Sequence, residues 1–387
     1  MQYCKSCVMP STRPGLMFDD DGVCQACANY EKRKHIDWDK RHDELADICD
    51  DHRRDDGYYD CIIPVSGGKD SHFLTYTMSE RFDMNPLLVT VGAPFSTTDA
   101  GAHDLRNLKE TFGCDHMQFD MSHETFRTTT RAGFEKLGEP LRFVEAAIYV
   151  LPILIAMRFD VPFVMYGENS GYEYGLQEEE SMLAMEDIQA TIESIDIEFW
   201  RGQEGIDDSM LNAVKSSSDL KLVSSDVEPM YMSYFVPWNG YKNFKIAREN
   251  GFKSVRGEWE RPGHIESYDQ IDSVGYIIHN WMKYPKFGFA RTTDILCRHI
   301  RWGLISRKAA SRLVMERDGK LDQVALDDFC DFCGYTQQEF YDIANQWYNQ
   351  EIFEFDERLY EWDLKDPIWR DLPTERSGVK ALDGVDI

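Results

Sequence analysis

One short segment of the chain combines residue types that could bind and activate a nucleotide: PVSGGKDS, residues 64–71. Two adjacent glycines let a ligand approach the backbone closely, and the N–H groups at the start of a helix attract anions. Lys69 adds positive charge, Ser66 and Ser71 add hydroxyl donors, and the carboxylate of Asp70 suits Mg²⁺. The Walker pattern, Gly-Lys-Ser/Thr after a glycine and four residues, is not matched. The segment therefore predicts a phosphate-binding loop of another kind.

A second group of residues that could do chemistry lies at the N-terminus, where two Cys-x-x-Cys pairs enclose sixteen residues. The four cysteines are Cys4, Cys7, Cys24 and Cys27. This spacing is typical of zinc sites, in which four thiolates on two tight turns close a tetrahedron and leave no open position for water. We therefore predict a structural zinc ion. Cys330 and Cys333 lie in a helical pattern without a second pair, and helical periodicity explains them better than metal binding. The remaining cysteines, expected to be packed thiols, are Cys49, Cys61, Cys114 and Cys297.

The elements that must position these residues alternate between strand and helix patterns. Short apolar runs predict strands at 58–65, 85–93, 115–121 and 161–169. Helical patterns lie between them, at 70–82, 99–113, 122–138 and 143–159, with Ser122 as an N-cap. This alternation favours an α/β fold with a parallel sheet, whose ligands bind at the carboxyl ends of the strands. Those ends carry the loop, Gly92 and Gly167-Glu168-Asn169.

Composition and charge restrict the class of protein. The 387 residues include 42 Lys and Arg against 69 Asp and Glu, which gives a net charge of −27. This charge is unsuited to gripping a nucleic acid, because that affinity rests largely on neutralising phosphates. No apolar run approaches the roughly 20 residues that span a bilayer, and the N-terminus shows no apolar core of a signal peptide. We therefore expect a cytoplasmic protein without a membrane span or a nucleic-acid partner.

The pattern of elements divides the chain into four parts. They are a zinc-binding knuckle at 1–30, a helical linker at 31–57, a nucleotide-binding domain at 58–260 and a mainly helical region at 261–387. Residues at about 176–229 are strongly acidic and predict an exposed helical insertion, with a docking surface as the less favoured interpretation. After Ser306 the pattern is helical to about Asn349 and then aromatic and acidic, with a frayed tail from Thr374.

The loop and five longer segments carry a resemblance to a known family. PVSGGKDS after a strand resembles the PP-loop ATP pyrophosphatase superfamily, an adenine nucleotide alpha-hydrolase-like fold whose members cleave ATP to AMP and pyrophosphate. The segments that begin CKSCVMP (4–27), FEKLGEP (134–153), YGENSGY (166–175), PWNGYKN (237–253) and KFGFART (286–307) together resemble the N-acetyl sugar amidotransferases of bacterial surface-glycan biosynthesis, such as lipopolysaccharide and O-antigen. The family is implied to convert an N-acetyl group on a nucleotide-activated sugar into an acetamidino group, with ammonia from a separate glutaminase subunit.

The resemblance assigns roles at the predicted sheet edge. The ATP site would comprise Ser66, Gly67, Gly68, Lys69, Asp70, Ser71, Gly92 and Gly167. In the implied reaction the amide oxygen attacks the α-phosphate of ATP, pyrophosphate leaves, and ammonia then displaces AMP. Lys69, the loop amides and Mg²⁺ at Asp70 would stabilise the departing pyrophosphate, so positioning and charge matter more than a nucleophile. Glu168 would hold ammonium or accept its proton, although a carboxylate that caps a loop is an equal alternative.

Further candidates would contact the sugar or its phosphates. By the resemblance Asn169 lies near the nucleotide or sugar, while Tyr172 and Tyr174 either stack on the substrate or pack in the core. The C-terminal region also holds a basic cluster in an otherwise acidic chain. Its members are Lys286, Arg291, Arg298 and Arg301. The cluster predicts either an anionic ligand, such as the diphosphate of the sugar or pyrophosphate, or a solvated helix face.

A PP-loop enzyme that modifies tRNA, of the thiolase or lysidine-synthetase type, is the alternative, since some of these enzymes carry zinc knuckles. The acidic charge and the lack of an evident cysteine pair for sulfur transfer favour the amidotransferase. No cysteine lies in a glutaminase setting, because position 2 is Gln2 and Gly113-Cys114-Asp115 does not form the required Gly-x-Cys-x-Gly elbow. The ammonia is therefore expected from a partner subunit.

Overall fold

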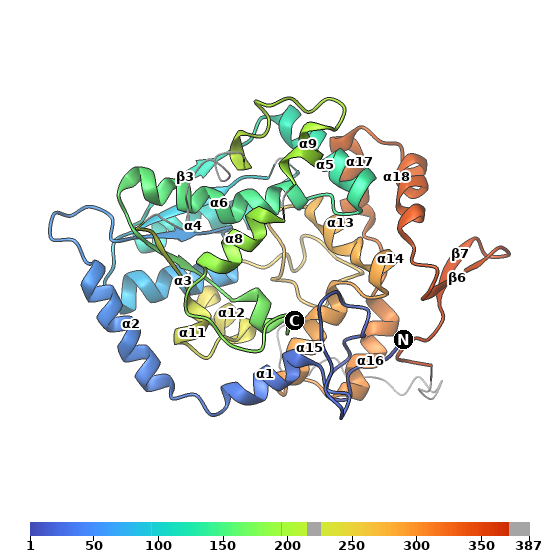
Figure 1. Cartoon of the computed structure of the whole chain (residues 1–387), viewed down its shortest axis with the longest axis horizontal. Helices are drawn as coiled ribbons and strands as arrows, with labels where there is room; N and C mark the ends of the chain where they lie inside the picture. The colour runs from blue at the N-terminus through green and yellow to red at the C-terminus, as the bar shows by residue number, and fades with distance from the viewer. Residues whose placement is uncertain (94, 195, 215–225, 371–387) are drawn as a thin grey trace.

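The computed structural model describes residues 1–93, 95–194, 196–214 and 226–370. Five parallel strands form a central sheet in the order β3-β2-β1-β4-β5, with helices on both of its faces (Figure 1). Their bounds are β1 (Cys61–Pro64), β2 (Pro86–Val91), β3 (Asp115–Phe119), β4 (Phe163–Tyr166) and β5 (Glu228–Tyr231). The predicted α/β class and the parallel sheet are confirmed.

Strand β1 shows how the sequence builds this sheet. Cys61 and Ile63 pack into a cluster with helix α3 (Lys69–Tyr76), whereas Ile62 packs on the opposite face with helix α6 (Arg142–Phe159). A strand that is covered on both faces has to be apolar throughout, which is why the run before the loop has no polar alternation. The loop therefore begins on a strand that is held from two sides.

The remaining helices of the sheet region are α2 (Trp38–His52), α4 (Asp99–Phe112), α5 (His123–Leu137), α7 (Ser170–Glu173), α8 (Met185–Glu193), α9 (Ile197–Arg201), α11 (Met232–Phe235) and α12 (Gly240–Glu249). Helices α4 and α5 follow the predicted segments closely, whereas α7, α11 and α12 were not predicted. Ser122 is confirmed as the N-cap of α5, since its Oγ accepts a hydrogen bond from Thr125 N at 3.1 Å. The helix expected at 70–82 differs, because α3 ends at Tyr76 and a π-helical turn, Thr77–Arg81, completes it.

The acidic segment at 176–229 is only partly the helical insertion that its composition predicts. Helices α8 and α9 lie within it, and residues 215–225 of the prediction lie outside the described residues. Its last two residues belong to strand β5, which pairs with β4 at the edge of the sheet. The sequence analysis missed β5 because it is four residues long and includes Pro229, which is tolerated only at edges and strand starts.

The C-terminal region is mainly helical, as predicted. Its helices are α13 (Tyr276–Trp281), α14 (Lys283–Phe287), α15 (Arg291–Arg301), α16 (Arg307–Arg317), α17 (Gln323–Cys333), α18 (Gln337–Ala344) and a 3₁₀ turn, Asn345–Trp347. A short antiparallel hairpin, β6 (Phe353–Asp356) and β7 (Glu361–Leu364), was not expected. The predicted tail from Thr374 lies outside the described residues.

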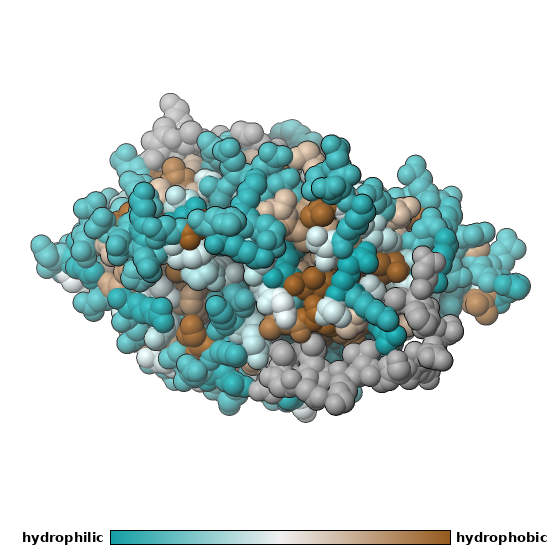
Figure 2. All heavy atoms as spheres, turned by 90° about the horizontal axis from the view of Figure 1, so that it is seen from below, coloured by the Kyte–Doolittle hydropathy of each residue, from teal (hydrophilic) through white to brown (hydrophobic). Residues whose placement is uncertain are grey.

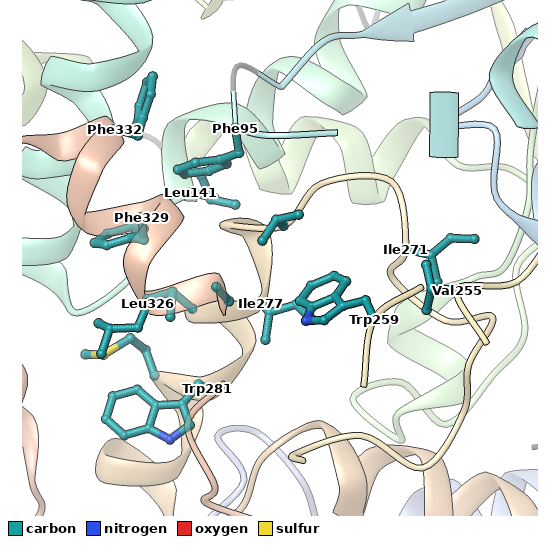
Figure 3. Close-up of a cluster of buried hydrophobic side chains, with 14 of the residues drawn as sticks. Phe95, Leu141, Val255, Trp259, Ile271, Ile277, Trp281, Leu326, Phe329 and Phe332 are labelled. Carbon is teal, nitrogen blue, oxygen red and sulfur yellow. The ribbon is translucent and has the colours of Figure 1, made fainter. Parts of the chain in front are cut away.

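An aromatic core joins the C-terminal helices to the sheet region (Figure 3). Phe95, from the segment after β2, packs edge-on against Phe332 and stacks on Phe329, both on α17. Leu141 and Trp281 belong to the same buried cluster. Because this core contains residues from both regions, the C-terminal helices are held at a fixed position beside the carboxyl edge of the sheet.

The molecular surface agrees with the acidic composition. The face in Figure 2 is covered mainly by hydrophilic side chains, with smaller apolar areas between them. In the part of the chain that the structure describes, no helix is both long enough and apolar enough to cross a bilayer.

Candidate active site

The predicted phosphate-binding loop lies between β1 and α3, at the carboxyl edge of the sheet. Its turn is closed by the two serines, because Ser71 Oγ accepts from Ser66 N at 3.0 Å and Ser66 Oγ accepts from Gly68 N at 3.3 Å. Gly67 has a φ of +88°, and a Cβ there would lie 3.0 Å from Leu105 N on α4. A glycine is therefore required at this position both by the backbone angle and by the close approach of α4.

Lys69 is buried at the edge between two carboxylates. Its Nζ lies 2.8 Å from Asp70 Oδ2 and 3.8 Å from Asp269 Oδ1, and its exposed fraction is 7%. Burial alone would lower the pKa of Lys69, but the nearby carboxylates of Asp70, Asp269 and Glu266 outweigh it and raise the pKa. The ammonium is therefore a fixed positive charge at the mouth of the loop.

The C-terminal half of the chain supplies the partners of this lysine. Asp269 accepts two hydrogen bonds from Arg291, both at 2.7 Å, and although burial opposes it, Arg291 holds the pKa of Asp269 well below its usual range. Asn243, on α12, donates to Asp70 Oδ1 at 2.8 Å. The loop, α12, the segment before α13 and α15 thus form one network of hydrogen bonds and ion pairs around Lys69.

Glu168 lies at the end of β4, near the same network. Burial and the charge of Asp70 raise the pKa of Glu168, and Arg298 opposes them from 3.8 Å. Arg298 is itself buried, and its Nε has no hydrogen-bond partner among the described residues. A carboxylate with a raised pKa beside a loosely paired guanidinium is a better proton acceptor than a firmly paired carboxylate.

Tyr174 lies between three arginines. Its hydroxyl accepts hydrogen bonds from Arg298 at 2.8 Å and Arg291 at 3.3 Å, and the guanidinium of Arg13 lies 4.2 Å from the centre of its ring. Burial alone would raise the pKa of Tyr174, but Arg298 and Arg291 outweigh it and lower the pKa. The predicted basic cluster therefore gathers around a tyrosine and does not form a solvated helix face at these two arginines.

Other predicted site residues lie farther from this network. Lys286 donates to the carbonyl of Leu137 and pairs with Glu139 at 2.8 Å, so its described contacts link α14 to the end of α5. Tyr172 is buried against α1 (Gln25–Arg33), where its hydroxyl donates to the carbonyl of Asn29. For these two residues the structure favours a packing role over contact with a sugar or phosphate.

Asn169, Gly92 and Gly167 support the strand ends. Asn169 is the N-cap of α7 and accepts from Tyr172 N, while its own Nδ2 has no partner among the described residues. A Cβ at Gly92 would lie 1.8 Å from Asp120 Oδ1, and one at Gly167 would lie 3.2 Å from Trp238. Both glycines therefore let neighbouring side chains pack against the ends of β2 and β4.

The four N-terminal cysteines converge as the sequence predicts. Their sulfur atoms all lie within 4.8 Å of one another, with 3.7 Å between Cys7 and Cys24 and 4.0 Å between Cys4 and Cys27. Zinc–sulfur bonds of about 2.3 Å in a tetrahedron place the sulfurs about 3.8 Å apart, so this geometry fits zinc. In Figure 1 the N-terminal loops lie against α15 and α16, and Leu296 and Ala310 pack beside the cysteines.

The other cysteines match their predicted packing roles. All ten cysteines are buried and free of disulfide bonds. Cys330 and Cys333 lie on α17 within the aromatic core, and the described residues contain no second group of metal-ligating side chains. Helical periodicity thus explains this pair.

Three contributors were missed by the sequence analysis. Asn243 lies within the segment PWNGYKNF that carries the family resemblance, so a signal for it existed. Arg13 lies in the loop between the cysteine pairs, within another segment that carries the resemblance, 4–27. Asp269 lies in a segment of turns and has no local pattern that could reveal it, because it acts through a contact with a distant part of the chain.

Comparison with known proteins identifies the C-terminal region. Residues 241–366 match the family model described as "LPS biosynthesis protein WbpG-like, C-terminal domain". The match confirms the resemblance to a surface-glycan biosynthesis family over this third of the chain, and it includes Asn243, Asp269, Arg291 and Arg298. The chain is also 23% identical over 158 residues to the uncharacterized protein MJ1599 of Methanocaldococcus jannaschii, which covers 40% of this chain and 56% of that protein.

Solved structures with weak overall similarity include three proteins. NMN synthetase from Francisella tularensis has a TM-score of 0.31 and 10% identity, over 78% of this chain and 94% of that one. The U34-tRNA thiolase NcsA from Methanococcus maripaludis has a TM-score of 0.33 and 13% identity, over 87% and 96%. The NH3-dependent NAD synthetase from Campylobacter jejuni has a TM-score of 0.29 and 14% identity, over 58% and 99%. Similarities this low do not bear on the activity.

Proposed function

We propose that the protein is an ATP-dependent amidotransferase that converts the N-acetyl group of a nucleotide-activated sugar into an acetamidino group for a bacterial surface glycan. One observation carries the proposal: the region matched to an LPS biosynthesis family places Asp269 and Asn243 on Lys69 and Asp70 of the phosphate-binding loop. A domain of glycan biosynthesis and a nucleotide loop therefore share one site. The net charge of −27 argues against the alternative of a tRNA-modifying enzyme.

The chemistry requires activation of an amide, because an amide oxygen is a poor leaving group. In the proposed reaction the amide oxygen attacks the α-phosphate of ATP and pyrophosphate departs. Ammonia then adds to the amide carbon, and AMP leaves with the former amide oxygen. The N–H groups of the loop and the ammonium of Lys69 would stabilise the departing pyrophosphate, and Lys69 would exchange its contact with Asp70 for phosphate oxygens.

Two further side chains would handle protons and charge. Glu168, whose pKa is raised, would accept the proton that ammonium gives up before attack. Arg298 lies 3.8 Å from Glu168, and its Nε has no hydrogen-bond partner in the part of the chain that the structure describes, so we assign Arg298, together with Arg291, to the anionic carrier of the sugar. Mg²⁺ bound at the partly exposed carboxylate of Asp70 would neutralise phosphate charge.

The four-cysteine site and the source of ammonia complete the proposal. We assign zinc to Cys4, Cys7, Cys24 and Cys27, with a structural role because four sulfurs leave no position for water. A glutaminase nucleophile has to be accessible to glutamine, yet every cysteine of this chain is buried. We therefore infer a separate cytoplasmic glutaminase subunit that delivers ammonia to the carboxyl edge of the sheet.

A product assay tests the proposal directly. The protein is incubated with labelled ATP, Mg²⁺, ammonium chloride at raised pH and a nucleotide-activated N-acetyl sugar. AMP, pyrophosphate and an acetamidino sugar are expected in equal amounts, and the same sugar without its N-acetyl group is the control. Glutamine in place of ammonium should give no product with this chain alone. Formation of ADP and phosphate, or turnover with glutamine, would contradict the proposal.

A further inference from the structure

We propose that the four-cysteine knuckle (residues 4–27) and helix α1 position the catalytic carboxylate, by holding the segment Gly167–Gln177 that carries Glu168. The catalytic role of Glu168 rests on the proposed function, whereas the mechanical link between knuckle and segment does not. Four sets of contacts make this link, three through α1 and one through the loop between the cysteine pairs.

The first contact is made by Asn29, on the helix that begins within the second cysteine pair. Its Nδ2 donates to the carbonyls of Tyr172 at 2.9 Å and Gln177 at 2.8 Å, and its carbonyl accepts from the hydroxyl of Tyr172 at 3.2 Å. Asn29 is 1% exposed, so water cannot replace these hydrogen bonds. The segment after β4 is thus fixed to α1 at its middle, Tyr172, and at its last residue, Gln177.

The second contact is a close approach of two backbones. Gly175 has a φ of +76°, and a Cβ at this position would lie 2.3 Å from Ala26 N. Ala26 lies between Cys24 and Cys27, so the segment touches the metal-binding turn itself. Only a glycine permits this distance.

Arg33, at the end of α1, extends the link to the neighbour of the catalytic residue. Its guanidinium pairs with Glu173 and donates to the carbonyl of Ser233 at 2.6 Å. The hydroxyl of Ser233 in turn accepts from Asn169 N at 3.0 Å. The peptide that follows Glu168 is therefore tied to α1 through one intervening residue.

The fourth contact comes from the loop between the cysteine pairs. Arg13 pairs with Asp294 of α15 at 2.6 Å and lies over the ring of Tyr174. The hydroxyl of Tyr174 accepts from Arg298, which is the cation beside Glu168. The knuckle thus contacts the segment both through α1 and through Arg13.

Metal binding and the order of this segment are therefore linked. The metal fixes the turn from which α1 starts, and α1 fixes the segment. By thermodynamic linkage, the factor by which bound metal favours the ordered segment equals the factor by which the ordered segment strengthens metal binding. A purely structural knuckle that only stabilised the N-terminus would show no such reciprocity.

Hydrogen exchange and metal titration test the link without any assay of turnover. The full chain is compared with and without its metal, and with the substitution Gly175→Ala. The matched control is Gly57→Ala, since Gly57 has a φ of +74° but nothing within 4 Å of an added Cβ. We expect at least tenfold faster exchange at residues 169–177 after metal removal and in Gly175→Ala, with little change in β1 and β2. The chelator concentration that removes half of the metal should fall in Gly175→Ala and stay unchanged in Gly57→Ala.

A second variant distinguishes loss of the proposed link from a general folding defect. Asn29→Leu removes the hydrogen bonds to Tyr172 and Gln177 and leaves the cysteines in place. Faster exchange confined to 169–177 in this variant would support the link. Unchanged exchange there, both in Asn29→Leu and after metal removal, would overturn it. With substrate, Asn29→Leu should lower kcat more than it raises the KM for ATP, and absence of any turnover in the wild type would contradict the proposed function alone.

Discussion

The four-cysteine knuckle and the edge around Lys69 differ in how far apart in the sequence their functional side chains lie. The knuckle draws all four of its metal ligands from residues 4–27. The edge draws its charges from β1, β4 and the C-terminal region, so that Lys69 and Asp269 are 200 positions apart and yet in contact. The knuckle is therefore a local structure, whereas the edge exists only when the whole chain is folded.

This difference predicts how a substitution in each region affects stability and turnover. Removal of one cysteine destroys the knuckle, because a tetrahedral site needs all four ligands. Removal of one charge from the edge leaves other charges with partners, since Asp269 keeps Arg291 and Asp70 keeps Asn243. Substitutions at the edge should thus impair chemistry more than stability. Substitutions in the knuckle should lower stability and, through the segment Gly167–Gln177, should lower turnover as well.

Lys69→Ala should produce the largest effect and tests the edge. The ammonium is the cation nearest to the loop, so we expect AMP formation to fall by about 10²–10³-fold or more. The free energy of unfolding should fall by less than the roughly 3–5 kcal/mol typical of a broken buried ion pair, because both carboxylates keep a partner. Turnover is measured as AMP release and stability by urea unfolding.

The control for Lys69→Ala is Lys34→Ala, which removes a lysine that pairs with Glu31 at the surface. Exposed pairs of this kind contribute about 0–1 kcal/mol, so neither turnover nor stability should change much. If turnover of Lys69→Ala lies within threefold of the wild type, the ammonium of Lys69 does not contribute to the reaction. The proposed difference between the edge and the knuckle would then be wrong.

Cys24→Ser should have the second-largest effect and tests the knuckle. The wild type is expected to hold about one zinc per chain, and the variant should lose it, because an alcohol is a poor replacement for a thiolate. The thermal midpoint should fall by several degrees, since metal binding is coupled to local folding. Cys330→Ser is the matched control, as it alters the first cysteine of the helical pair on α17. Full zinc content in Cys24→Ser, or zinc loss in Cys330→Ser, would refute the assignment.

The same difference explains what could be predicted from the sequence. The loop and the cysteine ligands follow from short spacings, and β1 through β4 follow from apolar runs, because these features depend on neighbours in the chain. The role of Asp269 depends on a contact with Lys69 across the fold, which no local pattern records. Lys286 shows the converse: it is close in sequence to Arg291, but it points to the end of α5 and pairs with Glu139. Proximity in sequence was therefore a poor guide to the basic cluster.

The smallest expected effect concerns a histidine that supports the loop. His72, on α3, is fully buried, and its Nδ1 lies 3.1 Å from the carbonyl of Gly68, while Asn107 Nδ2 lies 3.2 Å from its Nε2. Burial lowers the pKa of His72 to about 4, against about 6.5 in an unfolded chain. The knuckle, residues 4–27, contains no histidine. Protonation of His72 should therefore affect the edge around Lys69 and not the knuckle.

The sign of the pH dependence follows from these values. Between pH 4 and pH 6.5 the unfolded chain binds a proton at His72 and the folded chain does not, so the free energy of unfolding rises with pH across this window. A shift from pH 7.5 to pH 5.5 should cost about 1.3 kcal/mol through this group. His72→Gln removes the proton site, so urea unfolding of the variant should show a pH dependence smaller by that amount. An equal loss of stability on acidification in His72→Gln and the wild type would show that the histidine beneath the loop is not kept neutral by burial, and that the acid sensitivity of the edge has another source.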